Sequence, residues 1–198
     1  MTQRIVLASN NSGKLKEFND LLTEAGYEIL PQRDFATPEI EETGLTFVEN
    51  AILKARNAAA HSGLPAIADD SGIEVDALAG RPGIYSARFA GEGASDKDNL
   101  DKLLEALRDT ADTERGARFQ CLLVFMRHAE DPTPIICQGT WEGRILRDPR
   151  GENGFGYDPV FFIPKENASA AQISAESKNR LSHRGKALRQ LLKRLTSH

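Results

Sequence analysis

The sequence predicts a single α/β domain over residues 1–198, built on a mixed central sheet. A strand, a helix and a second strand follow one another within residues 5–30, and this β-α-β order is typical of an α/β fold. The first apolar run, Ile5–Ala8, does not alternate with polar residues, which indicates a strand buried on both faces. No internal repeat, low-complexity segment or long linker divides the chain, and about 150 residues is the usual size of a domain.

The elements of the first half follow from the spacing of apolar residues and from helix start and stop signals. A helix is expected where Leu15, Phe18 and Leu22 recur at helical intervals, and Gly26 supplies a stop. A capping-box pattern that begins at Thr46 opens an alanine-rich helix. The expected elements are strands at 5–8 and 27–30, helices at 15–25 and 46–62, and a short strand at 65–68 that Asp69–Gly72 interrupts before it resumes at 73–75.

The second half carries glycine-rich loops, a further helix and several strands. Residues 79–94 exceed the about 12–15 residues usual for a loop, which hints at a functional role. Ser95 or Asp96 caps a helix whose leucines share one face. The expected elements are this helix to Leu107, a long strand at 118–127, a strand pair at 134–141 and 143–146, a glycine-rich loop at 148–159, a strand at 160–163 and a last helix at 187–195.

Composition and charge exclude several classes of protein. The chain has 25 basic and 29 acidic side chains, and its net charge of −4 argues against nucleic-acid polymers and anionic membranes, because both need a large positive face. No apolar run approaches the about 18 residues of a membrane span, and the N-terminus lacks a signal-peptide pattern. Cys121 and Cys137 lie in apolar runs without metal-ligand spacing, as in a reduced protein. We therefore expect a cytoplasmic protein that binds neither a nucleic-acid polymer nor a membrane.

A polar loop links the first strand to the first helix, which is where ligands bind in open α/β sheets. A helix N-terminus offers unpaired N–H groups and the positive end of a dipole, and both suit phosphate. Small polar side chains add donors and Lys14 adds a positive charge, although the spacing is not that of a Walker A motif. The same residue types are also good loop and cap formers. The candidate phosphate site comprises Ser9, Asn10, Asn11, Ser12, Gly13 and Lys14.

Adjacent carboxylates beside an apolar strand form a second candidate site. Asp69 and Asp70 are costly to bury without a cation or donors, so a hard divalent metal such as Mg²⁺ is a natural partner. The same carboxylates could orient a water molecule for attack on phosphorus. The alternative is a simple turn that joins two strands. Glu41 and Glu42 could add a metal carboxylate, and Lys54 by itself is an ordinary solvated lysine of a helix.

Two segments of the second half could bind a nucleobase. Within Gly154–Pro159, glycines flank two aromatic side chains, and planar bases stack on such rings. The segments Lys178-Asn179 and Ser182-His183-Arg184 carry donors that could bind the carbonyl oxygens of a base. Plainer interpretations are an aromatic turn packed on the core and a solvated basic helix start. A single mechanism would use all these candidate groups. The first loop and Lys54 would hold a triphosphate, the carboxylates a metal ion, and the aromatic loop with the His-Arg pair a base.

Taken together, these stretches resemble the inosine triphosphate pyrophosphatase family, in the form of its bacterial branch. The matching stretches are residues 9–14, 41–47 with 49–51 and Lys54, 69–72, 82–88, 154–159 and 182–184. They occur in the family's order along nearly the whole chain, and this order is far more specific than any one motif.

The resemblance implies a fold and a reaction. The mixed sheet would be elongated and flanked by helices, in two lobes with the active site in the cleft between them, and the protein would be a homodimer. The enzyme would be a nucleoside triphosphate pyrophosphatase that hydrolyses non-standard purine nucleoside triphosphates (ITP, dITP and XTP) to the monophosphate and pyrophosphate with Mg²⁺. It would remove deaminated purines from the nucleotide pool. The alternatives are a nucleotide sensor without hydrolysis, a septum-inhibitor-type pyrophosphatase for modified or pyrimidine nucleotides, and a pure interaction protein.

The resemblance also implies a role for each site residue. Asp70 would be the general base and a metal ligand, with Glu41 as the second metal carboxylate and Glu42 as its alternative. The phosphates would be bound by Ser9, Asn10, Asn11, Ser12, Gly13, Lys14 and Lys54. Other substrate contacts would come from Ser71, from Phe155 by stacking on the base, from Gly156, Tyr157, Asp158 and Lys178, and from His183 and Arg184 near the 6-oxo group.

Overall fold

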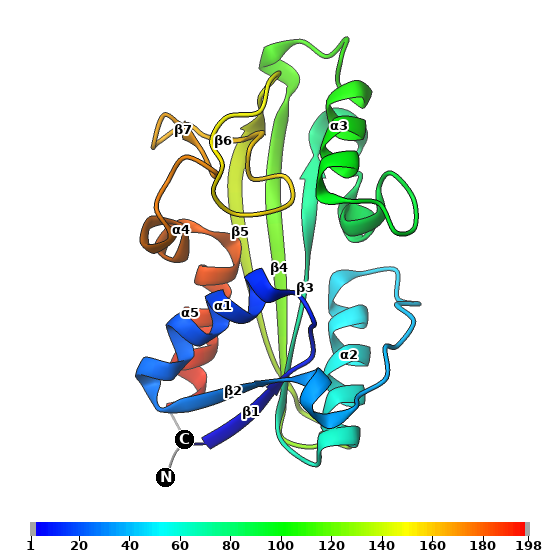
Figure 1. Ribbon diagram of the computed structural model, residues 1–198, viewed down its shortest axis with the longest axis vertical. Coiled ribbons are helices and arrows are strands. Elements are labelled where there is room, and N and C mark those ends of the chain that lie inside the picture. Colours follow the sequence, from blue (N-terminus) through cyan, green and yellow to red (C-terminus); the bar gives the residue numbers. More distant parts are fainter. Residues whose placement is uncertain (1–2, 197–198) are drawn as a thin grey trace. The chain divides into compact units, whose positions relative to one another are not determined.

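The computed structural model describes residues 3–196 and confirms the α/β class with a mixed sheet flanked by helices (Figure 1). The sheet has seven strands in the order β2-β1-β3-β4-β5-β6-β7. The strands are β1 (Gln3–Leu7), β2 (Tyr27–Pro31), β3 (Ala66–Val75), β4 (Gly116–Met126), β5 (Ile135–Ile145), β6 (Phe161–Ile163) and β7 (Ala168–Ser169). The helices are α1 (Ser12–Leu22), α2 (Phe47–Ser62), α3 (Asp96–Ala106), α4 (Ala175–Leu181) and α5 (His183–Leu195).

The chain forms two compact units. Unit 1 holds the residues up to Asp70, residues 121–139 and the residues from Arg184 onward, and unit 2 holds residues 71–120 and 140–183. Strands β3, β4 and β5 each contribute residues to both units. Each unit has its own hydrophobic core. The organisation of residues 1–198 as one elongated domain with an active site in a cleft stays a prediction.

Unit 1 contains parallel strands that are covered on both faces. Strand β1 pairs in parallel with β2 and with β3. Along β1, Ile5 and Leu7 pack in the core formed with α1 and α5, whereas Val6 packs in the core formed with α2. The same alternation continues in β3, where Ile67 belongs to the α1–α5 face and Ala68 belongs to the α2 face. Burial on both faces explains why the first apolar run does not alternate.

Helices α1 and α2 each begin directly after a polar residue that caps the helix. Asn11 caps α1, because its side chain accepts a hydrogen bond from the Lys14 backbone N–H, and Thr46 caps α2 by accepting one from Glu49. Gly63 ends α2 with a φ of 66°, a left-handed conformation that glycine adopts without strain. The predicted starts and stops of these helices are therefore confirmed to within a few residues.

Unit 2 is organised around aromatic side chains from three strands. The ring of Phe161 lies 4.6 Å from that of Phe119 and 5.3 Å from that of Trp141, centroid to centroid. Strand β6 pairs antiparallel with both β5 and β7. Helix α3 begins with a complete capping box formed by Ser95 and Asp98, so Ser95 is its cap, and its leucines enter the aromatic core.

Strand β3 runs without interruption from Ala66 to Val75, so the predicted break at Asp69–Gly72 is wrong. Adjacent carboxylates are costly to bury without a cation or hydrogen-bond donors. In the structure the aspartates stay in the strand because lysines from neighbouring helices neutralise them, Lys14 on Asp69 and Lys54 on Asp70.

Strand β5 is also continuous, from Ile135 to Ile145, and the predicted strand pair at 134–141 and 143–146 is wrong. Gly143 lies inside the strand rather than at a turn. A Cβ at this position would lie 2.5 Å from the carbonyl oxygen of Phe162 and 2.6 Å from the ring of Phe161. The glycine therefore permits the close approach of β6.

The basic C-terminal segment forms two helices, where the sequence predicted one helix over 187–195. Ser182 has extended backbone angles (φ −67°, ψ 160°) and separates α4 from α5. Helix α5 consequently begins at His183, so that His183 and Arg184 open a helix as predicted. The predicted loop over 79–94 contains a short 3-10 helix at Gly83–Arg88.

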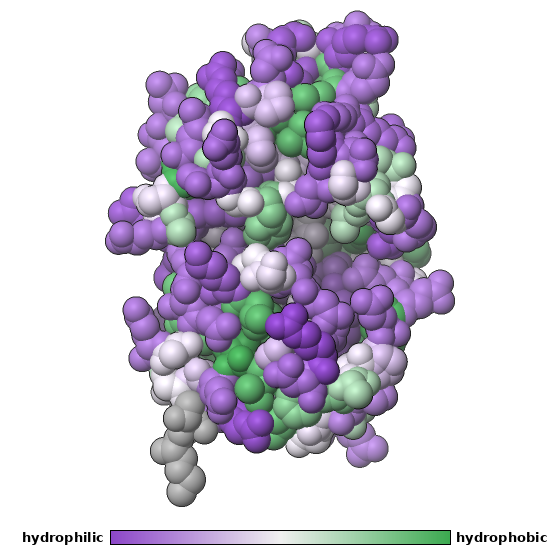
Figure 2. Space-filling model, in the orientation of Figure 1, coloured by the Kyte–Doolittle hydropathy of each residue, from purple (hydrophilic) through white to green (hydrophobic). Residues whose placement is uncertain are grey.

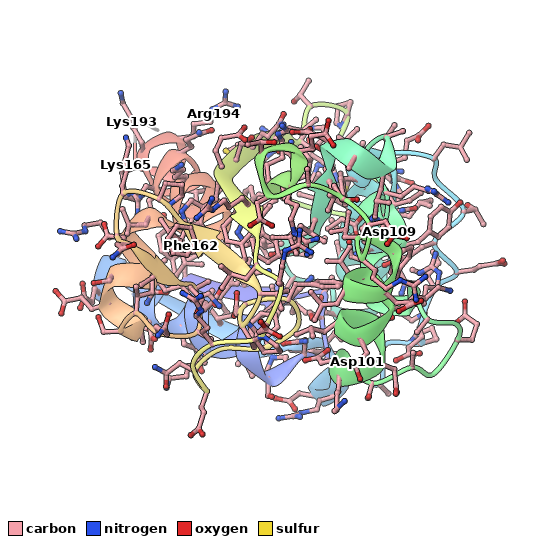
Figure 3. All side chains as sticks on the ribbon, turned by 90° about the horizontal axis from the view of Figure 1, so that it is seen from above. Asp101, Asp109, Phe162, Lys165, Lys193 and Arg194 are labelled. Atoms are coloured by element: carbon pink, nitrogen blue, oxygen red, sulfur yellow. The ribbon has the colours of Figure 1, made fainter. Side chains whose placement is uncertain are left out.

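The surface and the cysteines agree with the composition. Cys121 and Cys137 are both buried and free. The face drawn in Figure 2 is mostly hydrophilic. Lys193 and Arg194 are exposed near the end of α5 and point outward in Figure 3. Within residues 3–196, no helix is both long and apolar enough to cross a membrane.

Candidate active site

The loop after β1 presents polar groups at the start of α1. The Ser9 hydroxyl accepts a hydrogen bond from the Asn11 backbone N–H at 3.2 Å, and the Asn11 side chain accepts one from the Lys14 backbone N–H at 2.9 Å. The Asn10 side chain donates to Glu39 at 3.3 Å. The loop residues are exposed or half-buried, so the positive end of the α1 dipole is open to a ligand. This is a helix start that can bind an anion.

Asp69 and Asp70 are adjacent in β3 but project to opposite faces of the sheet. Side chains alternate along a strand, and the two preceding residues of β3 pack on the α1–α5 face and the α2 face respectively. Accordingly, Lys14 Nζ of α1 lies 2.9 Å from Asp69 Oδ1, whereas Lys54 Nζ of α2 lies 2.5 Å from Asp70 Oδ1. Both predicted phosphate-binding lysines therefore contact neighbouring residues of one strand.

Lys54 lies between two carboxylates. Its Nζ is 2.5 Å from Asp70 Oδ1, 2.8 Å from Glu42 Oε1 and 3.1 Å from the carbonyl oxygen of Asp69. Burial alone would lower the pKa of Lys54, but the charges of Asp70 and Glu42 outweigh burial and raise it. Because its side chain is only 15% exposed, Lys54 is not an ordinary solvated lysine of a helix.

Asp70 has one carboxylate oxygen engaged and one available. Oδ1 accepts from Lys54, while the buried Oδ2 has no hydrogen-bond partner among the residues that the structure describes. Burial raises the pKa of Asp70 above its usual value, against the opposing effect of Lys54. A buried carboxylate oxygen without a partner is costly, so this atom points to a bound water, substrate or cation.

The residues around Asp70 fit a magnesium ion. The described part of the chain has no cluster of three or more metal-binding side chains. Mg²⁺ bound together with a nucleotide is usually held by only one or two carboxylates and by substrate phosphates. Asp70 offers Oδ2, Glu42 is paired with Lys54, and Glu41 is exposed and makes no ion pair within residues 3–196. Glu41 is thus the carboxylate of this loop that is available to a cation.

Asn50 positions the acidic loop and was missed in the sequence. The Gly44 backbone N–H donates to Asn50 Oδ1 at 2.8 Å, and Asn50 is fully buried. A Cβ on Gly44 would lie 2.6 Å from Glu49 Cβ and 2.7 Å from Asn50 Oδ1, so a larger residue does not fit there. This contact fixes the backbone next to Glu41 and Glu42. The sequence does offer one sign of this role, because asparagine is unfavourable in the interior of a helix unless its side chain has a specific partner.

Arg184 is buried in an ion-paired cluster of unit 1. Its guanidinium binds the carboxylates of Asp69 and Glu17, and its side chain is 2% exposed. Burial would lower the pKa of Arg184, but Asp69 and Glu17 raise it instead. The sequence singled out Arg184 as a purine contact and gave Glu17 no role. Glu17 follows Lys14 by three positions on α1, a spacing that puts both on one helix face and could have revealed their shared partner.

In unit 2 the aromatic loop meets α4. Lys178 Nζ lies 2.6 Å from Asp158 Oδ2 and 4.7 Å from the centroid of the Phe155 ring. Asp158 Oδ2 also accepts from the Phe155 backbone N–H at 2.9 Å. Gly154 has a φ of +79°, and a Cβ there would overlap Asp158 Oδ2. The structure thus brings together Phe155, Asp158 and Lys178, which the sequence assigned to base recognition.

His183 and Tyr157 are both buried in unit 2. The His183 ring stacks on Phe119, with centroids 4.8 Å apart and planes 12° apart, and its centroid lies 6.3 Å from that of Trp141. The Tyr157 hydroxyl donates to the carbonyl oxygen of Ser86 at 2.7 Å, and burial raises the pKa of Tyr157. Both side chains are therefore held by core contacts that sequence motifs do not reveal.

Ser71 and Gly156 are the remaining residues that the sequence predicted to contact the substrate. Ser71 directly follows Asp70 in β3 and is half-buried. The Gly156 backbone N–H donates to Asp96 at 2.8 Å. Asp96, which the sequence suggested as an alternative helix cap, therefore anchors the aromatic loop.

These features define an α/β protein whose unit 1 carries a phosphate-type site, with an open helix start after a parallel strand and lysines beside buried carboxylates. The chain belongs to the Ham1 family, whose model matches residues 5–194, and the resemblance that the motifs predicted is confirmed. A protein of Thioalkalivibrio sulfidiphilus named dITP/XTP pyrophosphatase is 62% identical, over 97% of this chain and 98% of its own. One of the same name from Vibrio parahaemolyticus is 58% identical over 98% of each chain. A solved structure of a HAM1 protein from Coxiella burnetii has a TM-score of 0.92 and 51% identity, covering 99% of this chain and 100% of that one.

Proposed function

We propose that this chain is a nucleoside triphosphate pyrophosphatase that hydrolyses ITP, dITP and XTP to the monophosphate and pyrophosphate. The proposal is carried by the cluster around Asp69 and Asp70 of β3. Lys14 binds Asp69 and Lys54 binds Asp70, while Asp70 Oδ2 has no hydrogen-bond partner within residues 3–196. Relatives named dITP/XTP pyrophosphatase, 58% and 62% identical over nearly the whole chain, support the same substrates here. The reaction removes deaminated purines from the nucleotide pool.

In the proposed mechanism, water attacks the α-phosphorus of the triphosphate and Asp70 accepts its proton. Burial raises the pKa of Asp70, which makes the carboxylate a stronger base, while the ion pair with Lys54 keeps it ionised and oriented. Lys14 and Lys54 neutralise charge that develops on the phosphate oxygens and on the departing pyrophosphate. The backbone N–H groups of the loop Ser9–Gly13 bind the same phosphates at the start of α1.

Mg²⁺ is part of the proposal because the donors suit it. Asp70 and Glu41 would hold the ion, with Glu42 as the alternative, since Asp70 Oδ2 is available and Glu42 is paired with Lys54. When bound, Mg²⁺ neutralises negative charge on the triphosphate.

We assign recognition of the base to residues of unit 2. Phe155 supplies a ring for stacking, and Lys178 and Asp158 hold that ring and its loop in place. His183 donates a hydrogen bond to the 6-oxo group, where adenine instead presents an amino donor, so ATP leaves a buried donor unpaired. A purine contact of Arg184 stays a prediction, since its guanidinium is engaged by carboxylates of unit 1.

The proposal is tested with a substrate panel. ITP, dITP, XTP, GTP, dTTP and ATP are incubated with the protein and Mg²⁺, and pyrophosphate is measured separately from orthophosphate. We expect pyrophosphate as the first product and the highest kcat/KM with the deaminated purines. Orthophosphate as the first product would exclude cleavage between the α- and β-phosphates, and a preference for dTTP would favour the septum-inhibitor type.

A homodimer and a cytoplasmic location complete the proposal. The family resemblance supports the dimer. The free, buried cysteines support a reducing compartment. Sedimentation of the purified protein tests the dimer.

A further inference from the structure

We infer that Asp69 is a positioning residue that holds Lys14 ready for phosphate, and that Asp69 ligates neither the metal nor the substrate. The inference rests on the proposed function and deepens it at the phosphate-binding cluster of unit 1. In the sequence, Asp69 and Asp70 look like one pair of carboxylates with a common task. The structure shows that the two side chains point to opposite faces of the sheet and bind different partners.

The side chain of Asp69 is fully engaged within unit 1. Oδ1 accepts from Lys14 Nζ at 2.9 Å, and Oδ2 accepts from the Arg184 guanidinium and from Cys121 Sγ at 3.6 Å. The side chain is 0% exposed. A metal ion or a water molecule could reach it only by breaking a buried ion pair, which is strongly unfavourable. Asp70, by contrast, keeps a carboxylate oxygen that has no hydrogen-bond partner in the part of the chain that the structure describes.

The backbone of Asp69 also orders the lysines. Its carbonyl oxygen accepts from Lys14 Nζ at 3.4 Å and from Lys54 Nζ at 3.1 Å. One residue thereby fixes the ammonium groups of two lysines that come from helices on opposite faces of the sheet. An ammonium group has three donors, and Asp69 engages two of those of Lys14, which leaves one for a phosphate oxygen.

The ion pairs also differ between the two faces of the sheet. On the α1–α5 face, Asp69 and Glu17 are balanced by Lys14 and Arg184. On the α2 face, the carboxylates of Asp70 and Glu42 both bind Lys54. The divalent cation of the proposed mechanism is therefore assigned to the α2 face, where Asp70 Oδ2 has no hydrogen-bond partner among the described residues.

Positioning matters because a lysine side chain is flexible. An ammonium group that must be ordered on binding loses rotamer entropy at that moment, whereas one already held in place does not. Asp69 removes this cost for Lys14, because it already holds the ammonium group. Its loss should therefore weaken phosphate binding without disturbing metal binding.

The experiment compares Asp69→Asn with Asp131→Asn, the same substitution at another buried aspartate of unit 1, which binds Arg127 at 2.5 Å. The probe is inorganic pyrophosphate as an inhibitor of ITP hydrolysis, because it has no base and reports on the phosphate site alone. We expect Asp69→Asn to raise the inhibition constant of pyrophosphate and the KM for ITP about tenfold, and to leave the half-saturating Mg²⁺ concentration within about twofold. Asp131→Asn should change none of these by more than about twofold.

A double-mutant cycle tests whether Asp69 acts through Lys14. If it does, Asp69→Asn added to Lys14→Met should weaken pyrophosphate binding by no more than about twofold beyond Lys14→Met alone. Independent, multiplying effects of the two substitutions would overturn the inference. So would a rise in the half-saturating Mg²⁺ concentration in Asp69→Asn, because that would make Asp69 a metal ligand.

A second pair of variants covers the case in which Asp69→Asn does not fold. The double variant Asp69→Asn/Arg184→Gln removes both charges of the buried Asp69–Arg184 pair, so Arg184 is not left charged without Asp69. Compared with Arg184→Gln alone, it should show the same loss of about tenfold in pyrophosphate binding. A wild-type protein that releases no pyrophosphate from ITP would contradict the proposed function. An active wild-type protein with unchanged pyrophosphate binding in the Asp69 variants would contradict only the inference.

Discussion

The imidazole ring of His183 stacks on the ring of Phe119, with the centroids 4.8 Å apart and the planes 12° apart. Both side chains are buried, and the Phe119 ring is itself packed against Phe161 at 4.6 Å. A stacked ring is restricted to one plane, so its N–H groups can donate only within that plane. Selection of a 6-oxo purine by His183 would therefore depend on Phe119, which belongs to none of the recognised motifs.

We expect Phe119→Leu to reduce the preference for ITP over ATP, measured as the ratio of kcat/KM values. His183→Ala should reduce the ratio further, because it removes the donor itself. A lost hydrogen bond to a buried polar group is worth about 1–3 kcal/mol, or about 5–150-fold in the ratio. Phe119→Leu should reduce the ITP/ATP ratio by a smaller factor than His183→Ala, because the imidazole remains but is less well oriented.

The matched control for this substitution is Phe125→Leu, in the core of unit 1. Both changes remove an aromatic ring from a buried strand position, so both should lower the midpoint of thermal unfolding. Only Phe119→Leu should change the ITP/ATP ratio. An equal change in both variants would mean that the ratio follows general stability and that the stacking of His183 has no part in selectivity.

Asp70→Asn is expected to lower kcat for ITP by about 10²–10⁴-fold, the usual contribution of a general base. The amide keeps the shape of the carboxylate and can still accept from Lys54, so binding of pyrophosphate as an inhibitor should be largely retained. Steady-state kinetics with ITP and pyrophosphate measure both quantities. A kcat close to that of the wild type would remove Asp70 as the base.

Glu41 and Glu42 can be distinguished by their metal dependence. Glu42 is bound to Lys54 at 2.8 Å, and Glu41 is exposed without an ion pair in the described residues. We expect Glu41→Gln to raise the half-saturating Mg²⁺ concentration about tenfold, and Glu42→Gln to raise it much less. Titration of activity with Mg²⁺ at saturating ITP measures the effect. The reverse order would make Glu42 the ligand and would require Lys54 to leave it when the ion binds.

The local part of this structure was readable in the sequence. Helix starts depend on a side chain and on backbone groups within three residues, so Asn11, Thr46 and Ser95 could be recognised as caps or cap candidates without any tertiary knowledge. The order of strands and helices followed from apolar periodicity for the same reason. The candidate phosphate and base segments were marked by their polar, basic and aromatic residue types, although the same types also form ordinary loops, caps and turns.

Features that depend on distant partners were not readable. The segment Asp69–Gly72 was expected to interrupt its strand. That Asp69 stays in the strand could not be foreseen, because Arg184, which binds it, lies 115 residues away in the sequence. Gly143 resembled a turn residue, and only the neighbouring strand β6 shows that it is needed for close packing. Nor does any motif indicate that Phe119 orients His183. In each case the chemistry of one residue is set by a side chain that the fold supplies, and a pattern along one segment does not contain it.

Asp131→Asn is expected to destabilise the protein in a pH-dependent way. The Asp131 carboxylate accepts from the Arg127 backbone N–H at 3.0 Å, from its guanidinium at 2.9 and 2.5 Å, and from the Thr133 backbone N–H at 3.0 Å. Hydrogen bonds from Arg127, together with the backbone donors, hold the pKa of Asp131 well below its usual value. A buried charged hydrogen-bond acceptor of this kind is worth about 1–3 kcal/mol, so the free energy of unfolding at pH 7 should fall by that amount.

The sign of the pH dependence follows from the lowered pKa. The ionised carboxylate stabilises the folded state at every pH above the unfolded value of about 3.9, and this stabilisation is lost as the pH falls toward the lower folded value. The difference between wild type and Asp131→Asn in urea unfolding should therefore be constant from pH 8 to pH 5 and should shrink below about pH 4. Asp112→Asn is the control, because Asp112 is also paired with an arginine but its side chain is 68% exposed, and it should cost less than about 1 kcal/mol. A difference for Asp131→Asn that did not shrink at acid pH would show that packing, rather than the charge, carries its contribution.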